Sequence, residues 1–274
     1  MIELPESAVL SEQIAQTFSG RRIVRAQAGF TPHGFAFYAG DPLLYGPMLE
    51  GKTLLGAQPL GGIVEIEIED LKLQLSDGVT PRLAPAGKPL PRKHQLLIQF
   101  DDGSSLTCGV RMYGFLHLIP SVQADNGYAA AGREKPSPLS EAFTPEYFEG
   151  LRSQAPEHIS LKGFLATEQR IPGLGNGCLQ DILFEAGLNP RAPLSGLTDP
   201  DYERLYRACV TVLREMRGLG GRNVEKDLFG QAGGYAVKLC AKTLNAPCPR
   251  CMGALTRQAY MGGNVYFCPH CQPI

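Results

Sequence analysis

The sequence predicts an α+β protein with two domains: a mostly β N-terminal domain with a leading helix, and a helical domain that ends in a four-cysteine module. Three observations predict this class. Strand-type alternation is confined to residues 1–118, helix-type periodicity dominates residues 140–235, and two Cys-x-x-Cys pairs lie in the last 27 residues. A chain of 274 residues is long enough for two hydrophobic cores.

The N-terminal domain begins with a predicted helix and continues with predicted strands. Apolar residues recur at helical spacing over residues 5–18, and residues 63–68 and 71–75 alternate apolar with polar side chains, as half-buried strands do. Residues 95–108 predict a hairpin with a glycine-containing turn. Residues 77–91 are rich in Pro and Gly, which predicts an exposed loop. One helix followed by many strands indicates a sandwich or a barrel.

A polar segment, residues 119–139, predicts a linker to a helical domain over residues 140–240. An apolar stripe over residues 202–216 predicts one helix of that domain. The glycine-rich residues 171–177 predict a turn that opens another helix, over residues 178–186. The free N–H groups of such a helix start can hold an anion, although a tight structural turn explains the glycines equally well.

The last segment, residues 241–274, carries the two cysteine pairs. Cys248 and Cys251 form the first pair, Cys268 and Cys271 form the second, and sixteen residues separate them. Four thiolates on two tight turns match the ligand set of one structural Zn²⁺, and two disulfides or four unrelated thiols are the alternatives. A zinc ion with four protein ligands has no open position, so we expect it to hold a shape rather than to catalyse a reaction.

The composition is that of an ordinary globular protein, with 43% hydrophobic and 19% charged residues. Because no stretch of eighteen apolar residues exists, we expect no membrane span, and the start of the chain lacks the pattern of a signal peptide. The other four cysteines are scattered, and we expect them to be reduced core residues. Together these features predict a cytoplasmic protein.

The charge distribution is uneven. A net charge of −1 argues by itself against a nucleic-acid-binding protein. However, residues 202–257 hold ten Lys or Arg against four Asp or Glu, and no acidic residue follows Asp227. We therefore expect a phosphate-contacting surface in this region, with a small basic tail that has no partner as the alternative.

Several segments, in chain order, resemble one protein family. The start, Met-Ile-Glu-Leu-Pro-Glu, resembles the Met-Pro-Glu-Leu-Pro-Glu start of the formamidopyrimidine-DNA glycosylase and endonuclease VIII (Fpg/Nei) family. Residues 162–187 are similar to its helix–two-turns–helix element, and the cysteine module is similar to its zinc-finger β-hairpin. Arg111-Met-Tyr-Gly114 is similar to its Arg-Arg-Phe-Gly motif, which inserts into the DNA stack.

The resemblance implies a β-sandwich beside a helical domain, with double-stranded, damaged DNA in the cleft between them and a monomeric protein. Members of the family flip a damaged base out of the duplex and cut its glycosidic bond in base excision repair. Their nucleophile is the amine of an N-terminal proline, which forms a Schiff base with the sugar. Elimination then nicks the strand, which is the lyase activity of the family.

The candidate catalytic residues implied by the resemblance are Met1, Ile2, Glu3 and Glu6. Ile2 stands where the family has its proline, and because removal of the initiator Met needs a small second residue, we expect Met1 to stay. Glu3 matches the carboxyl group that protonates the leaving group or the sugar oxygen, and Glu6 matches one that supports the site. Acidic residues near a helix start are also stabilised by its dipole, which is the purely structural alternative.

The candidate DNA-binding residues belong to the wedge motif and the helical domain: Arg111, Tyr113, Lys162, Asn176 and Asp181. Tyr113 is equally well explained as a half-buried strand residue. Two cationic phosphate clamps of the family are missing from this chain. The lysine of a β-domain turn falls at Gly61 or Gly62, or at Lys52 if the alignment shifts, and the hairpin arginine falls at Gly263. Each missing phosphate contact weakens DNA binding and lowers its salt dependence.

These observations predict a DNA-repair protein that binds damaged DNA and excises an oxidised base, with weak or absent lyase activity at abasic sites. If the protein is a glycosylase without lyase activity, either Glu3 activates water or the Met1 amine attacks as a displaced nucleophile. The alternatives from other classes are a non-catalytic relative that binds damaged or bent DNA, and a zinc protein that uses the scaffold for RNA or a protein partner.

Overall fold

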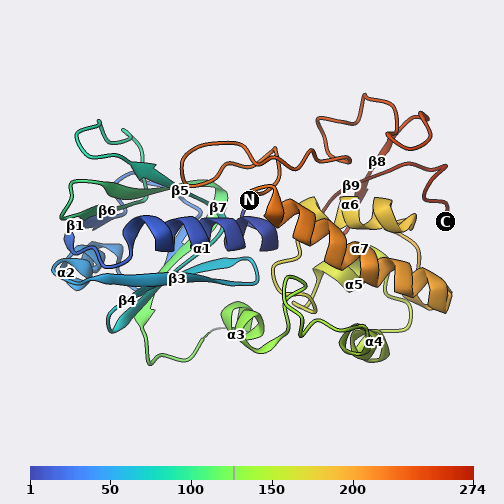
Figure 1. Ribbon diagram of the computed structural model, residues 1–274, viewed down its shortest axis with the longest axis horizontal. Coiled ribbons are helices and arrows are strands. Elements are labelled where there is room, and N and C mark those ends of the chain that lie inside the picture. Colours follow the sequence, from blue (N-terminus) through green and yellow to red (C-terminus); the bar gives the residue numbers. More distant parts are fainter. Residues whose placement is uncertain (126) are drawn as a thin grey trace.

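The computed structural model describes residues 1–125 and 127–274 and has the predicted α+β architecture. Figure 1 shows the strands of residues 23–120 gathered at one end of the molecule, the helices of residues 145–218 and the hairpin of residues 256–267 at the other, and the N-terminus between the two groups. The helices are α1 Leu4–Phe18, α2 Tyr45–Leu49, α3 Gly127–Glu134, α4 Pro145–Gln154, α5 Leu161–Ala166, α6 Asn176–Ala186 and α7 Asp199–Gly218. The strands are β1 Ile23–Ala28, β2 Ala36–Tyr38, β3 Leu54–Leu60, β4 Ile63–Ile68, β5 Leu71–Ala84, β6 Leu96–Phe100, β7 Ser105–Pro120, β8 Thr256–Tyr260 and β9 Gly263–Phe267.

Helix α1 joins the two halves of the molecule. Pro5 occupies its first turn, where no N–H donor is needed, and a Glu6 carboxylate oxygen accepts the Glu3 N–H at 3.3 Å. Leu4 packs into the core of the helical domain, whereas residues further along α1 pack into the core of the β domain, among them Ile14 and Phe18. The first residues of the chain are therefore fixed between the two cores.

The β domain is one hydrogen-bonded sheet in the order β1-β6-β7-β5-β4-β3, with β2 added in parallel to β7. Strands β5 and β7 are long and run through both parts of the sheet, and their pairing shifts register between Asp77 and Val79. Residues from both parts, such as Ile98 of β6 and Ile66 of β4, share one hydrophobic cluster. The sheet therefore folds over into the two layers of a sandwich.

The exposed loop that we predicted over residues 77–91 is wrong in its first half, because β5 continues to Ala84 and pairs with β7. Pairing with β4 stops at Ser76, which lies opposite Ile63, the first residue of β4, so the following part of β5 has an edge that β4 does not cover. The Leu83 N–H points to this edge and donates to the Leu228 carbonyl at 2.9 Å. Backbone N–H groups two residues apart in a strand point to the same side, so position 81, like Leu83, points away from β7. The N–H that Pro81 lacks would therefore not have bonded to β7.

The segment predicted as a linker contains helix α3. A side chain at Gly132 would collide with the Leu60 carbonyl, so the helix lies directly on the β3–β4 hairpin. Arg133 contacts both carboxylate oxygens of the buried Glu65, at 2.9 and 2.8 Å, and pairs with Asp125. Of the predicted linker, residue 126 lies outside the described residues. The described part is anchored to the sandwich by these contacts.

The helical domain packs α4–α7 around a second hydrophobic cluster. The predicted helices over residues 178–186 and 202–216 lie within α6 and α7. Thr198 and Asp201 form a capping box at the start of α7. The loop before α6 meets the β3–β4 turn so closely that a Cβ at Gly173 would lie 2.0 Å from the Gly62 nitrogen. The two domains touch backbone to backbone at this point.

The C-terminal module is the β8–β9 hairpin with its flanking turns, and it docks on α6. The Asn264 carbonyl of β9 accepts the side-chain amides of Asn176 at 2.8 Å and Gln180 at 3.2 Å. The Gln180 side-chain oxygen in turn accepts the Tyr266 N–H. The hairpin thus extends the face formed by the helical domain. Within the part of the chain that the structure describes, no helix is long and apolar enough to cross a membrane.

Candidate active site and DNA-binding cleft

A cleft of about 760 Å³ opens where the two domains meet. The chain start lines it together with strands of the β domain, the loop before α6 and the segment after α7. Its lining includes Met1, Ile2, Glu3, Asp77, Tyr113, Phe115, His117, Asn176, Arg222 and Glu225. A cleft of this size can take a flipped nucleotide, and three of the predicted catalytic residues lie on its wall.

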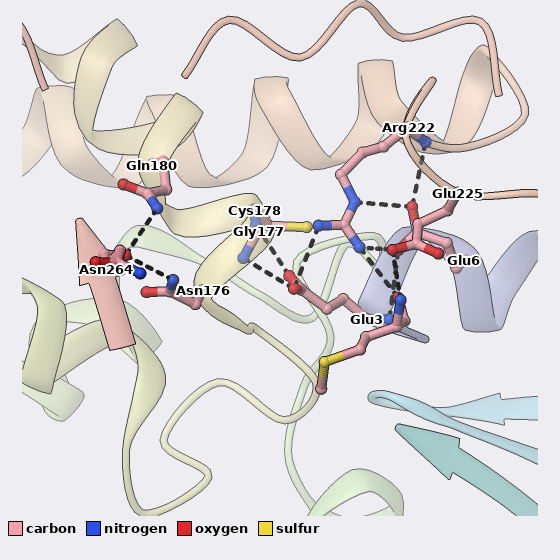
Figure 2. Close-up of polar contacts among 10 residues, drawn as sticks. Glu3, Glu6, Asn176, Gly177, Cys178, Gln180, Arg222, Glu225 and Asn264 are labelled. Carbon is pink, nitrogen blue, oxygen red and sulfur yellow. Dashed lines mark hydrogen bonds and ion pairs between the residues drawn. The ribbon is translucent and has the colours of Figure 1, made fainter. Parts of the chain in front are cut away.

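The Glu3 carboxylate sits on the N-terminus of α6 (Figure 2). It accepts the Gly177 N–H at 2.8 Å and the Cys178 N–H at 2.9 Å. Glycines 175 and 177 make this approach possible, because a Cβ at Gly175 would lie 2.5 Å from the Glu3 carboxyl carbon. Burial raises the pKa of Glu3, but Arg222 and the two amides outweigh it and hold this pKa below its usual value. Glu3 is therefore ionised at neutral pH.

Arg222 connects Glu3 to Glu6. Its Nε and Nη2 donate to the two Glu6 oxygens at 2.9 and 2.7 Å, and its Nη1 lies 3.2 Å from Glu3 Oε1. The arginine is only 3% exposed, and Glu3 and Glu6 are 9% and 6% exposed. Figure 2 shows the guanidinium between the two carboxylates, so the site is a compact buried triad of one cation and two anions.

The chain start is held by its own contacts. The Met1 amine pairs with Glu225 at the cleft wall, and the Met1 carbonyl accepts a hydrogen bond from Arg222 at 3.2 Å. The Ile2 nitrogen is a peptide N–H that donates to the Asp77 carbonyl at 2.6 Å, and the Ile2 side chain is buried. Residue 2 therefore offers no free amine to a ligand while Met1 is present.

Asp77 is a second carboxyl group in the cleft. Its backbone has a φ of 56°, which is unusual for a residue other than glycine, and its Oδ2 accepts the Ser76 hydroxyl at 3.0 Å. Burial raises the pKa of Asp77, although the Ser76 hydroxyl and the chain-terminal amine lower it in part. The cleft thus contains two carboxyl groups, Glu3 and Asp77, whose surroundings shift their pKa values in opposite directions.

The wedge motif forms a bulge on β7. Asp77 pairs with Gly114 and Val79 with Val110, so residues 111–113 face Gly78 alone. A Cβ at Gly78 would lie 1.8 Å from the Arg111 carbonyl, so only glycine fits opposite the bulge. Arg111 is exposed, Met112 has a φ of 59° and is 73% exposed, and Tyr113 is 38% exposed at the cleft. Three side chains therefore project beside the cleft.

The predicted DNA-binding residues of the helical domain make internal contacts. The Lys162 ammonium is largely buried and donates to the Tyr260 carbonyl at 2.6 Å, in the turn of the β8–β9 hairpin. Burial lowers the pKa of Lys162. Asn176 holds the hairpin through Asn264, while its side-chain oxygen makes no hydrogen bond within the described residues. Lys162 thus positions the hairpin, and Asn176 retains an acceptor beside the cleft.

Asp181 has no exposed surface, and its oxygens accept the N–H groups of Lys238 and Leu239 at 2.9 Å each. Burial raises the pKa of Asp181. A direct contact between this carboxylate and DNA would require the backbone of residues 238–239 to move away. The structure therefore gives Asp181 a supporting position beneath the segment that leads to the cysteine module, in place of the DNA contact that the resemblance implied.

The four terminal cysteines converge. The Sγ atoms of Cys248, Cys251, Cys268 and Cys271 all lie within 4.8 Å of one another. Cys248 Sγ is 3.9 Å from Cys271 Sγ, and Cys251 Sγ is 3.4 Å from Cys268 Sγ, whereas a disulfide would need about 2.0 Å. Zn–S bonds of about 2.3 Å in a tetrahedron place the sulfurs about 3.8 Å apart, which fits these distances.

Comparisons with known proteins give one consistent result. The chain is 27% identical to formamidopyrimidine-DNA glycosylase of Geobacillus kaustophilus over 278 residues, which are 99% of this chain and 100% of the relative. The corresponding Thermus thermophilus protein is 36% identical over 143 residues, about half of each chain. The crystal structure of MutM (Fpg) from Thermus thermophilus matches with a TM-score of 0.79 and 25% identity, covering 98% of both chains.

Along its whole length the chain is similar to formamidopyrimidine-DNA glycosylases of the Fpg/Nei family. The fold is also that of Lactococcus lactis Fpg in a complex with DNA that contains an abasic site, with a TM-score of 0.83, 24% identity, and coverage of 99% of this chain and 100% of that one. No family model matches the chain. Full-length coverage at low identity describes a distant but complete resemblance to these proteins.

Of the two missing clamp positions, Gly61 has no room for a side chain, whereas Gly263 has room but lies beside the Lys162 ammonium, which would repel a second cation. A Cβ at Gly61 would lie 2.7 Å from Pro172, and one at Gly263 would lie 3.5 Å from the Lys162 ammonium. Lys52 does not replace the first clamp, because it lies at the opposite end of β3 and pairs with Asp70. The turns that would carry the clamps are packed against the helical domain.

Sequence reasoning missed Arg222, Glu225 and Asp77. Arg222 lies 216 residues from Glu6, and no local pattern links the two positions. Two sequence features pointed to Arg222: the excess of basic residues over residues 202–257, and its place directly after the Gly220-Gly221 pair. Asp77 was assigned to a loop because of the nearby Pro and Gly residues. Only the fold brings these groups to the start of the chain.

Proposed function

We propose that this protein binds damaged double-stranded DNA in the cleft and hydrolyses the glycosidic bond of an oxidised base, with little or no lyase activity. The related proteins of Geobacillus and Thermus are named formamidopyrimidine-DNA glycosylases, and the Lactococcus protein of the same fold binds DNA with an abasic site. The single observation that carries the proposal is the ionised Glu3 carboxylate on the cleft wall beside a blocked residue 2.

Glu3 acts as a base in this proposal. Because its pKa is lowered, Glu3 carries no proton at neutral pH and accepts one from a water molecule in the cleft. The water oxygen bonds to the sugar carbon C1′ as the glycosidic bond breaks, and its proton passes to Glu3. The bonding electrons leave with the base, which takes up a proton from solvent.

The chain start explains the expected weakness of the lyase activity. A Schiff base with an abasic sugar needs a free amine, and the nitrogen of Ile2 is bound in a peptide bond. The Met1 amine lies at the cleft wall and is engaged by Glu225. Retention of Met1 therefore favours hydrolysis by water over attack by an amine.

The DNA-binding face combines the wedge and the hairpin. Arg111 and Tyr113 project from β7, and Asn176 lines the same cleft. Lys162 and Asp181 support this face from within through the hairpin turn and the segment before the cysteine module. DNA held by these groups would bring a flipped nucleotide next to Glu3.

Zinc would be held by Cys248, Cys251, Cys268 and Cys271, whose spacing and sulfur geometry fit one tetrahedral ion. With four protein ligands, the ion would contribute shape and no chemistry at the glycosidic bond. It would hold together the two cysteine-containing turns that flank the β8–β9 hairpin. In this way it would also fix the hydrogen bond between Asn264 of β9 and Asn176. A reducing cytoplasm would keep these thiols available for the metal.

Replacing Glu3 with glutamine is expected to slow base release by about 10²–10⁴-fold in single-turnover assays, because the amide cannot accept the proton of water. A panel of duplexes, each with one oxidised base, would be assayed for both binding and release. Glu12→Gln, an exposed change on the same helix α1, is the matched control and should behave as wild type. Equal release by wild type and Glu3→Gln would refute the assigned role of Glu3.

A non-catalytic DNA-binding role is the second candidate. One observation favours it: Arg222 and the α6 amides already engage the oxygens of Glu3 and Glu6. A protein of this kind would bind damaged duplexes without releasing any base, and Glu3→Gln would leave the binding unchanged. The same panel therefore separates the two candidates.

A further inference from the structure

We propose that the aromatic face of β2 and β7, formed by Phe35, Phe37, Tyr113, Phe115 and His117, is a stacking platform for unpaired nucleobases of DNA. The proposal deepens the DNA-binding function proposed above and rests on it. It names the part of the DNA that this face would take: bases that have lost their partners through flipping, a gap or strand separation.

Strand pairing, ring contacts and the cleft lining bring these rings together. Strand β2 runs parallel to β7, and Phe37 lies directly beside Phe115. The two rings stack with centroids 5.1 Å apart, and Phe115 contacts His117 edge to face at 5.2 Å. Tyr113 and Phe115 both line the cleft, and the carbonyl of Phe35, directly before β2, accepts the Gly114 N–H of β7 at 3.0 Å.

The platform begins inside the cleft and ends in the open. Tyr113, Phe115 and His117 line the cleft, whereas Phe35 is 62% exposed and Phe37 is 40% exposed. Because these two rings leave much of their surface exposed, they contribute little to the stability of the fold. Their continuity with the cleft makes them an extension of the DNA-binding surface.

The chemistry of the face suits nucleobases. Flat rings offset-stack on bases of any sequence, at about 1–3 kcal/mol per base. Gln74 and Ser76 of β5 lie opposite His117 and Phe115 on the same face, so polar groups accompany the rings at the level of the base edges. Burial lowers the pKa of His117, which leaves it an uncharged ring at neutral pH. Stacking would also compensate for the clamps that are absent at Gly61 and Gly263.

The test measures the binding of a fluorescent oligothymidine, a gapped duplex and a fully paired duplex with one oxidised base. For Phe37→Ala, we expect affinity for the single strand and the gap to fall about 5- to 150-fold, which corresponds to the stacking of one base. Affinity for the paired duplex should change less than twofold. Phe37→Leu keeps an apolar side chain without the ring and should lose most of the same affinity.

Phe30→Ala is the matched control, because Phe30 is 52% exposed but stacks on His94 away from this face. A 2-aminopurine in the single strand reports stacking directly, through quenching that Phe37→Ala should relieve. Unchanged single-strand binding by Phe37→Ala, or an equal loss in Phe30→Ala, would overturn the platform while leaving duplex binding intact. Wild-type protein that binds none of the three DNAs would instead overturn the proposed function.

Discussion

Replacing Arg222 with methionine is expected to lower the free energy of unfolding by about 3–5 kcal/mol, because removing one partner of a buried ion pair leaves the other charge uncompensated. Here two carboxylates lose their shared cation at once. Glu3 keeps the two α6 amides, whereas Glu6 loses both of its guanidinium hydrogen bonds. Chemical denaturation at neutral pH, followed by circular dichroism, measures the change.

The effect of the Arg222→Met change depends on pH in a defined direction. In the wild type the pKa of Glu3 is lowered, so its stabilising contribution is present above the unfolded pKa of about 4.5 and is lost as pH falls through the folded value. Without Arg222, burial becomes the dominant influence on Glu3 and raises its pKa. The variant should therefore lose stability relative to wild type as pH rises from about 4 to 7.

Arg217→Met provides the control for Arg222, because Arg217 is about half exposed and pairs only loosely with Glu12 at 3.8 Å. Its effect should stay below about 0.5 kcal/mol. A loss in Arg222→Met no larger than this, or one that does not vary with pH, would show that the triad of Glu3, Arg222 and Glu6 is not an electrostatic unit.

Replacing Cys268 with serine is expected to abolish zinc binding and to disorder the C-terminal hairpin. Structural zinc sites bind with about 10–16 kcal/mol of apparent free energy, most of which is coupled to folding. Cys268 is fully buried, and its N–H donates to Gln272, which in turn donates to the Leu188 carbonyl of the helical domain. Loss of the metal should therefore weaken both the hairpin and its docking on α6.

Metal analysis of the purified wild type should give one zinc per chain, and Cys268→Ser should give close to none. Duplex affinity should fall at least tenfold, because the hairpin carries one side of the proposed DNA-binding face. Cys209→Ser is the control, since Cys209 is buried in the helical core away from the cluster. Full zinc content in Cys268→Ser, or unchanged DNA affinity after zinc loss, would contradict this role for the module.

Local patterns predicted the elements whose causes are local. The apolar spacing over residues 5–18 and 202–216 corresponds to α1 and α7, and the alternation over residues 63–68 corresponds to β4. The loop prediction over residues 77–91 was wrong in its first half. A proline is tolerated there because position 81 points to the edge of β5 that is not paired with a neighbouring strand. Composition does not reveal which edge of a strand is free.

The site could be predicted only where the family motifs carry it. Glu3 and the cysteines follow from short motifs, and the structure brings each to a defined place. The positions of Arg222 and Asp77 depend on packing between segments far apart in the chain. Lys162 illustrates a further limit: the motif identifies the residue, but only the fold shows that its ammonium is bound to the hairpin turn.

Borohydride trapping on duplexes with one oxidised base or one abasic site, combined with separate measurements of base release and strand nicking, tests the central claim most directly. We expect wild-type protein whose intact mass shows that Met1 is retained to release the oxidised base and to leave an abasic strand that breaks only in hot alkali. Little covalent adduct should form on either DNA. Rapid nicking with an abundant trapped adduct would contradict the claim that residue 2 is blocked and that Glu3 directs water to the sugar.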